Sequence, residues 1–149
     1  MCGWGKKSRA KEQALGRSRG GFSTKVHALT DALGNPIKFI LTGGQESDIG
    51  QAETLLTGIQ AGALLADKGY DADVLLDTLK EKGMAAVIPP TANRTVQRPC
   101  DWSLYKERHL IECFFGKIKH YRRIFSRYEK LAVNYLSFLS FVGALIWLR

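Results

Sequence analysis

Residues 105 to 119 place one carboxylate in line with two cationic side chains and an aromatic ring. On an ideal helix, where each residue advances by about 100°, an arc of roughly 60° holds Tyr105, Arg108, Glu112 and Lys119. The apolar residues of the segment lie on the opposite side, as in an amphipathic helix. Such a face could bind a charged ligand, but on its own it is more often a solvated surface with an ordinary i,i+4 ion pair between Arg108 and Glu112.

A second candidate carboxylate follows a short apolar run. The continuous run Ala63 to Ala66 is typical of a strand buried on both faces, and it ends at Asp67, with Gly69 two residues later. A carboxylate at the end of a buried strand is held rigidly, and a glycine in the turn allows a ligand to approach closely. Without other information, a turn or helix-capping role is the commoner one for such an aspartate, and Asp71 and Asp73 are interpreted in that way.

The elements that would position these residues alternate between strands and helices. Periodicity predicts strands at 22–30, 37–42, 63–66 and 84–88, and helices at 48–59, 73–82, about 101–123, and from 130 onward. The turn residues at 31–36 join the first two strands into a hairpin. The strand, helix, strand order over 63–88 indicates a crossover unit, so the predicted fold class is α/β with a mixed sheet flanked by helices.

Composition limits the classes of protein that fit. The 149 residues, 45% of them hydrophobic, suit a single domain with its own core. The 22 Lys and Arg residues against 14 Asp and Glu give a formal net charge of +8, which favours a polyanionic partner. The three cysteines lack C-x-x-C spacing and suggest neither a disulfide framework nor a zinc site.

Residues 1–21 are basic and show no apolar periodicity. They are predicted to form a flexible arm before a domain at 22–149.

The C-terminal apolar run, residues 131–148, raises the question of a membrane span. It is long enough in principle, but it contains Asn134, Ser137, Ser140 and Gly143, which fall at steps of three along a narrow polar stripe. A buried terminal helix is therefore favoured, with no membrane partner. No apolar segment follows the N-terminal lysines as a secretory signal would require, and a cytoplasmic location is expected.

The four-residue face has the pattern Y-x2-R-x3-E-x6-K, which resembles the signature helix of insertion-sequence DDE transposases. Further segments resemble the same family in the expected order, namely 16–21 with 24–27, 66–71, and 122–130. The resemblance covers nearly everything after residue 15. It implies an RNase H-like fold, in which three acidic residues hold two divalent ions that activate a water or a 3′-hydroxyl for in-line attack on a phosphodiester.

Carried over onto this sequence, the resemblance implies that Asp67 is the second acid and Glu112 the third, each both catalytic and a metal ligand. Mg²⁺ is the implied ion, with Mn²⁺ as an alternative, because both prefer oxygen ligands. The implied DNA-binding residues are Tyr105, Arg108, Lys119, Arg122 and Arg123, and the basic surface is extended by Lys117, His120 and Arg127. The implied partners are the DNA of the transposon ends, the target DNA and a further copy of the chain. The implied location is the nucleoid of a prokaryotic cell.

The resemblance breaks at the N-terminus. The first catalytic Asp of the family belongs on an opening strand upstream of Thr24 to His27, but residues 1–21 contain Glu12 as their only acid. We therefore expect an incomplete RNase H-like domain whose first strand is missing and whose sheet has an unpaired edge. The chain would be the C-terminal part of a transposase, inactive alone, from a frameshifted second reading frame or a decayed element.

Two functions remain open for such a chain. The first is a transposase fragment that cleaves and joins DNA with metal ions once an upstream half supplies the missing acid. The second is a DNA-binding remnant or inhibitor without catalysis, which would show salt-sensitive but metal-independent binding. Whether the chain alone is an enzyme therefore stays undecided. A small membrane-associated basic protein is a third interpretation, which the polar stripe disfavours.

Overall fold

The computed structural model describes residues 12–19 and 21–149 and divides the chain into two compact units. The first unit joins the N-terminal part up to Glu46 with Cys113–Arg149, and the second unit is Ser47–Glu112. Each unit contains strands and helices, so the predicted α/β class is confirmed. The specific RNase H-like arrangement, and the treatment of 22–149 as one domain, stay predictions.

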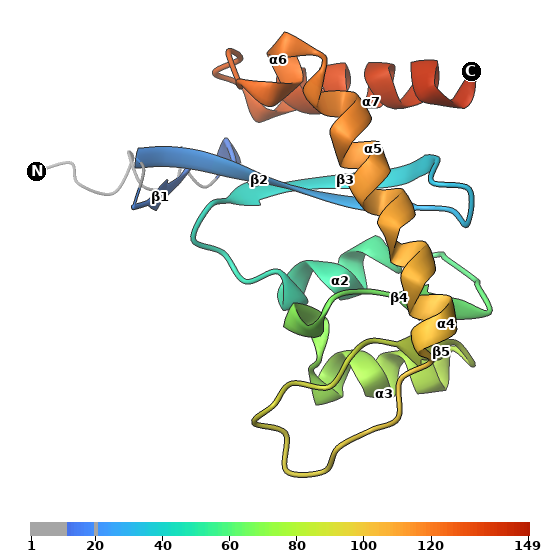
Figure 1. The fold of residues 1–149 in the computed structure, drawn as a ribbon. Coiled ribbons are helices and arrows are strands. Elements are labelled where there is room, and N and C mark those ends of the chain that lie inside the picture. The colour runs from blue at the N-terminus through green and yellow to red at the C-terminus, as the bar shows by residue number, and fades with distance from the viewer. Residues whose placement is uncertain (1–11, 20) are drawn as a thin grey trace, which may run out of the picture. The chain divides into compact units, whose positions relative to one another are not determined.

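The first unit is built on an antiparallel hairpin (Figure 1). Strand β2 (Gly21–Thr30) pairs with β3 (Pro36–Gly43), and β1 (Gly16–Ser18) pairs with the start of β2, in the order β1-β2-β3. The hairpin turn forms because Asp31 Oδ1 accepts the backbone N–H groups of Leu33 at 2.9 Å and Asn35 at 2.8 Å. The predicted hairpin is thus confirmed, with both strands slightly longer than expected.

Strand β1 corrects part of the prediction for residues 1–21. A flexible arm was expected there, but Gly16 pairs with Ser23 and Arg17 with Phe22 in an antiparallel ladder. Backbone pairing needs no apolar periodicity, which is why the pattern missed it. A Cβ on Gly16 would lie 2.6 Å from the backbone nitrogen of Gly44, which cannot move aside as a flexible side chain could, so only glycine fits there. Residues 1–11 and 20 of the predicted arm lie outside the described residues.

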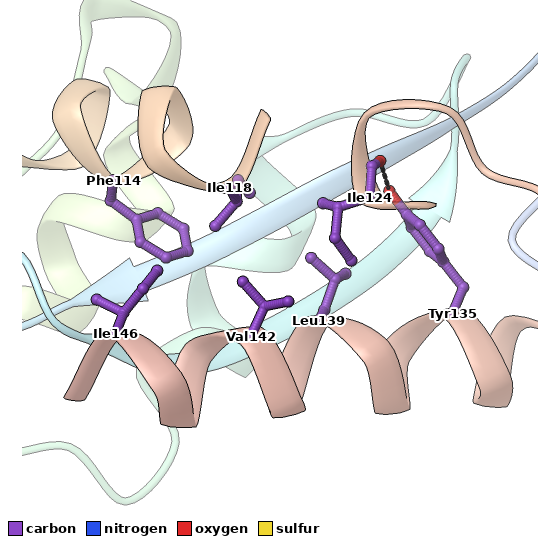
Figure 2. Close-up of a cluster of buried hydrophobic side chains, with 7 residues drawn as sticks. All are labelled: Phe114, Ile118, Ile124, Tyr135, Leu139, Val142 and Ile146. Carbon is purple, nitrogen blue, oxygen red and sulfur yellow. Dashed lines mark hydrogen bonds between the residues drawn. The ribbon is translucent and has the colours of Figure 1, made fainter. Parts of the chain in front are cut away.

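The core of the first unit packs α7 (Ala132–Trp147) against β3 and the last turns of α5 (His109–Lys119). Figure 2 shows the seven buried side chains, which are Phe114, Ile118, Ile124, Tyr135, Leu139, Val142 and Ile146. Tyr135 is buried with its hydroxyl satisfied, because it donates to the carbonyl of Ile124 at 2.7 Å. At Gly143 the helix approaches β3 so closely that a Cβ would meet Phe39 and Pro36 at 3.2 Å.

Helix α7 confirms the prediction of a buried terminal helix. One face lies in the core, and on the other face the hydroxyls of Ser137 and Ser140 donate to carbonyls of their own helix, at 2.8 and 2.9 Å. The helix has 16 residues. Over residues 12–19 and 21–149, no helix combines the length and apolarity needed to cross a membrane.

The second unit contains a parallel crossover. Strand β4 (Ala63–Leu65) pairs with β5 (Ala85–Val87) in parallel, and α3 (Asp73–Glu81) connects them after the 3-10 turn η1 (Lys68–Tyr70). Helix α2 (Ile49–Leu55) precedes this crossover, and its Ala52 joins a core completed by Leu56, Leu75, Leu79, Met84 and Ile88. The predicted crossover is confirmed. The single mixed sheet is not, because the described strands form two separate sheets.

The helix predicted over 101–123 is divided into shorter elements. It begins at α4 (Trp102–Tyr105), capped by Asp101, whose Oδ1 accepts from the backbone N–H groups of Ser103 and Leu104 at 3.0 Å. A 3-10 turn, η2 (Lys106–Arg108), connects α4 to α5. Tyr121 then adopts an extended backbone before α6 (Arg122–Phe125), and this bend lets Ile118 and Ile124 enter the same core.

Candidate active site

Asp67 lies just after β4, and a hydrogen bond with the turn that follows holds its side chain in place. Its backbone is extended, and its Oδ1 accepts the N–H of Gly69 at 2.8 Å, which caps η1. A Cβ at Gly69 would lie 2.9 Å from that oxygen, so the glycine permits the close approach. The side chain is exposed, and Oδ2 has no hydrogen-bond partner in the part of the chain that the structure describes. The capping role therefore leaves one oxygen available to a ligand.

Tyr70 lies beside this aspartate as a neutral hydroxyl. Burial, followed by the negative charges of Asp48 and Asp67, raises the pKa of Tyr70 to about 12. The phenol therefore stays protonated at neutral pH. It can donate a hydrogen bond but adds no charge of its own to the surroundings of Asp67.

The predicted helix face comes together at Glu112. Its Oε1 accepts a hydrogen bond from Nη2 of Arg108 at 2.5 Å, and the Glu112 side chain is 61% exposed. The Arg108 guanidinium lies 5.6 Å from the centre of the Tyr105 ring, a cation–π distance. Trp102 meets the same ring edge-on at 5.6 Å. Three of the four face residues thus form one contact chain in spite of the 3-10 turn between them.

The basic residues predicted to follow this face differ in how they are used. Lys119 and Arg122 are exposed on α5 and α6. Arg123 donates to Oε1 of Glu129 at 3.1 Å and lies 5.2 Å from the centre of the Phe138 ring, so it has structural contacts as well. These three residues belong to the first unit.

Arg127 was also expected on the basic surface, and the structure places it in internal contacts. Its guanidinium donates to Oγ1 of Thr24 at 2.6 Å, to the carbonyl of Glu129 at 3.0 Å and to the carbonyl of Lys130 at 3.1 Å. It also lies 5.4 Å from the centre of the Tyr135 ring. Arg127 therefore fastens β2 to the segment before α7, and the predicted basic surface has one member fewer.

Asp71, which had been assigned to an ordinary turn or cap, forms a buried ionic cluster. Its side chain is fully buried and accepts hydrogen bonds from Nη2 of Arg98 at 2.6 Å, the N–H of Thr91 at 2.7 Å and Nη1 of Arg94 at 2.9 Å. Burial acts to raise the pKa of Asp71, but the bonds from Thr91 and Arg98 and the charge of Arg94 outweigh it and lower the pKa. This cluster fixes the loop between β5 and α4 next to the turn that carries Asp67.

Comparison with known proteins identifies the family. Residues 2–147 match the family model described as transposase DDE domain. The chain belongs to the DDE transposase family. No solved structure matches it.

Two curated relatives of this DDE transposase support the assignment. The chain is 43% identical over 129 residues to a Brucella ovis protein assigned as the transposase of insertion sequence element IS6501, covering 85% of the chain and 99% of the relative. It is 30% identical over 135 residues to a Burkholderia cepacia protein assigned as the transposase of element IS402, covering 83% of the chain. The match spans 62% of that second relative, which is the longer protein.

Family membership confirms the predicted class, a transposase for insertion-sequence transposition, and transposases act on DNA. The family uses divalent metal ions. Among the described residues, no group of three or more His, Cys, Asp or Glu side chains is placed to hold an ion. The DDE transposase chain presents its two candidate acids, Asp67 and Glu112, as exposed carboxylates of the second unit.

Proposed function

We propose that this chain supplies two metal-binding carboxylates, Asp67 and Glu112, to a site that cleaves and joins DNA during transposition of an insertion sequence. The observation that carries the proposal is the contact chain from Glu112 through Arg108 to Tyr105. It places a carboxylate with an available oxygen, which can bind a metal ion, beside a guanidinium, which can bind a phosphate, and an aromatic ring.

The donor set fits Mg²⁺, with Mn²⁺ as the alternative. Both ions prefer oxygen ligands, and Mg²⁺ retains waters and substrate phosphates in its shell, so one oxygen from each of a few carboxylates is enough. Asp67 and Glu112 each use one oxygen in a contact within the protein, with Gly69 and Arg108 respectively. The second oxygen of each carboxylate accepts no bond from any described residue, so it can bind an ion without breaking the fold.

The reaction supported by this arrangement is in-line substitution at phosphorus. Bound divalent ions would lower the pKa of an attacking water or 3′-hydroxyl and stabilise the departing 3′-oxygen. The attack forms one P–O bond and breaks the P–O3′ bond; the proton of the nucleophile passes to solvent, and the departing 3′-oxygen takes a proton from solvent to become a hydroxyl. Arg108, Lys119, Arg122 and Arg123 would hold phosphates of the substrate, and Tyr105 would pack against the same strand. Such contacts position DNA without reading its sequence.

A third acidic ligand is proposed to come from an upstream half of the transposase. Residues 1–21 have Glu12 as their only acid, so no aspartate precedes β2 where the family's first acid belongs. On this proposal the upstream segment also adds the first strand of an RNase H-like sheet. The chain then has little or no strand-transfer activity alone, and it acts at the nucleoid of a prokaryotic cell.

The decisive experiment is cleavage of a DNA that carries the element's own ends, in the presence of Mg²⁺. The chain alone is compared with the same chain fused in frame to its upstream segment. We expect cleavage by the fusion, at least about 100-fold faster than after Asp67→Ala or Glu112→Ala, because each variant removes a metal ligand. Asp77→Ala removes an exposed carboxylate from α3 and serves as the matched control, with unchanged cleavage.

A second function has separate support. The net charge of +8 and the exposed Lys119 and Arg122 also fit a DNA-binding chain without catalysis, which would occupy element ends. In that case neither the chain nor the fusion cleaves, and binding falls with salt but is the same with Mg²⁺ or with a chelator. Cleavage that survives both Asp67→Ala and Glu112→Ala would exclude the proposed catalytic assignment.

A further inference from the structure

The outer face of α7 is apolar and exposed, whereas the opposite face of the same helix lies in the core (Figure 2). No charged residue occurs between Ala132 and Trp147, in a chain whose net charge is +8. An ordinary surface helix presents charged side chains to water, and a helix that is apolar on all sides is usually buried. The outer face of α7 therefore has the composition of a surface that another molecule covers.

Six exposed side chains make up this outer face, and on an ideal helix they fall within an arc of about 100°. They are Val133, Ser137, Ser140, Phe141, Ala144 and, just after the helix, Leu148. The three large ones, Val133, Phe141 and Leu148, are 64%, 63% and 84% exposed. The hydroxyls of Ser137 and Ser140 already donate to carbonyls of their own helix. Covering the face therefore leaves neither hydroxyl proton without an acceptor.

The order of large and small residues along the outer face is nearly the same in both directions. Its centre lies between Ser140 and Phe141, with small residues at 137 and 144 and large ones at 133 and 148. In a two-fold symmetric dimer, residue i of one copy contacts residue j of the other, and j contacts i. Two antiparallel α7 helices would meet this condition. The facing pairs would be Val133 with Leu148, Ser137 with Ala144, and Ser140 with Phe141.

The charges at the ends of α7 also favour an antiparallel second copy. A helix carries about half a positive charge at its N-terminus and about half a negative charge at its C-terminus. The first turn of α7 contains no acidic residue and the last turn no basic residue, so its own side chains compensate neither end. An antiparallel copy brings opposite ends together. Because the helix has no charged side chain, two positively charged chains can meet there without a close pair of like charges.

We propose that the outer face of α7 binds the same face of a second copy of this chain, in an antiparallel and two-fold symmetric dimer. The proposal goes beyond the catalytic assignment and does not depend on it. A helix of 16 residues is about 24 Å long and about 10 Å wide, so this face offers roughly 240 Å². A standard interface buries about 800 Å² per partner. The dimer of this chain is therefore weak and dissociates on dilution.

Sedimentation equilibrium of the full chain, without DNA or metal, tests the surface. Val133→Glu places one charge from each copy in an apolar contact, so we expect the Kd of the dimer to rise at least about tenfold. Val74→Glu is the matched control and should leave the Kd unchanged. Val74 is 65% exposed and is the second residue of α3, as Val133 is of α7. Far-UV circular dichroism verifies that both variants keep their helices.

Disulfide trapping tests the register, in a chain whose three cysteines are replaced by serine. Val133→Cys/Leu148→Cys should form covalent dimers under a mild oxidant, because the two positions face each other across the interface. Within one copy they lie about 22 Å apart, too far for an internal disulfide. Val133→Cys alone should not form dimers, since the two copies of position 133 are also about 22 Å apart in the antiparallel register.

A rise in Kd for Val133→Glu but not for Val74→Glu, with trapping of the double cysteine variant alone, supports the antiparallel dimer. Trapping of Val133→Cys alone, or of neither cysteine variant, overturns the register. A chain that stays monomeric at every concentration, or equal dimerisation of the two Glu variants, means that this face is not a dimer interface and that the proposal is wrong. None of these outcomes tests the metal site, because cleavage is not measured.

Discussion

The second unit holds two arginine–carboxylate clusters that differ mainly in their exposure to water. The Asp71 side chain is 0% exposed and pairs with Arg98 at 2.6 Å, whereas Glu112 is 61% exposed and pairs with Arg108 at 2.5 Å. The distances are nearly the same, so distance does not distinguish them. Burial distinguishes the two clusters. Removing one partner of a buried ion pair leaves an uncompensated charge, whereas a charge in an exposed pair that loses its partner is solvated by water.

This difference separates a structural carboxylate from an available one. Asp71 accepts bonds from a backbone amide and two guanidinium groups, and water cannot replace them. Glu112 accepts one bond from Arg108 in solvent, so a metal ion could displace or share that bond at little cost. A short ion pair is therefore no sign of function by itself, and an exposed one is compatible with ligand binding.

The largest expected effect comes from Asp71→Ala. We expect the free energy of unfolding of the second unit to fall by about 3 kcal/mol, because Arg98 and Arg94 lose a fully buried counter-ion. Urea unfolding measures the decrease, and hydrogen exchange at the Thr91 amide, which donates to Asp71, locates it. Asp77→Ala on the exposed side of α3 is the control and should cost less than about 0.5 kcal/mol. A decrease at Asp71 as small as the control's would contradict the structural role.

Acid should weaken the same cluster in a defined pH range. The pKa of Asp71 is lowered from its ordinary value of 3.8, so the folded state prefers the ionised form. The ionised Asp71 carboxylate therefore contributes fully to the free energy of unfolding above pH 3.8. That contribution is lost as the pH falls through the still lower pKa of the folded state. The stability difference between wild type and Asp71→Asn should be constant near pH 7 and should shrink below pH 3.8. Urea unfolding at a series of pH values measures this, and a difference independent of pH would argue against an ionised Asp71.

The comparison of the two clusters also explains which parts of the molecule could be predicted from sequence. The Glu112 cluster is local, with partners four and seven residues away on one helix face, so helical spacing was enough to find it. The partners of Asp71 lie 20 to 27 residues away in a loop without periodicity, and no local pattern connects them. Their only sequence signal was a pair of arginines, Arg94 and Arg98, inside a proline-bounded loop.

The fold shows the same division between local and distant interactions. The turn at residues 31–36 was predicted correctly, and the hydrogen bonds of Asp31 that form it act over four residues or fewer. The pairing of β1 with β2, the separation into two sheets and the bend at Tyr121 depend on backbone pairing and core packing between distant residues. Hydrophobic periodicity contains no information on those choices.

The smallest expected effect is that of Glu112→Gln on stability. The variant keeps the size of the side chain and removes the charge that pairs with Arg108, so we expect a decrease of a few tenths of a kcal/mol at low salt. Because the pair is exposed, the decrease should shrink further in molar salt, where charges are screened over about 3 Å. Urea unfolding at both salt concentrations measures the difference, and Glu107→Gln, an exposed neighbour on η2, is the control.

The result shows whether Glu112 is a structural residue or a metal ligand. The two roles predict different losses of stability and of cleavage activity in the Glu112→Gln variant. A residue retained for folding loses stability and activity together, whereas a metal ligand loses cleavage by the fused transposase with almost no change in unfolding. Glu112→Gln should therefore be nearly silent in urea and strongly impaired in cleavage. If instead the Gln variant unfolds as easily as Asp71→Ala, the exposed ion pair is structural, and the distinction between the two clusters fails.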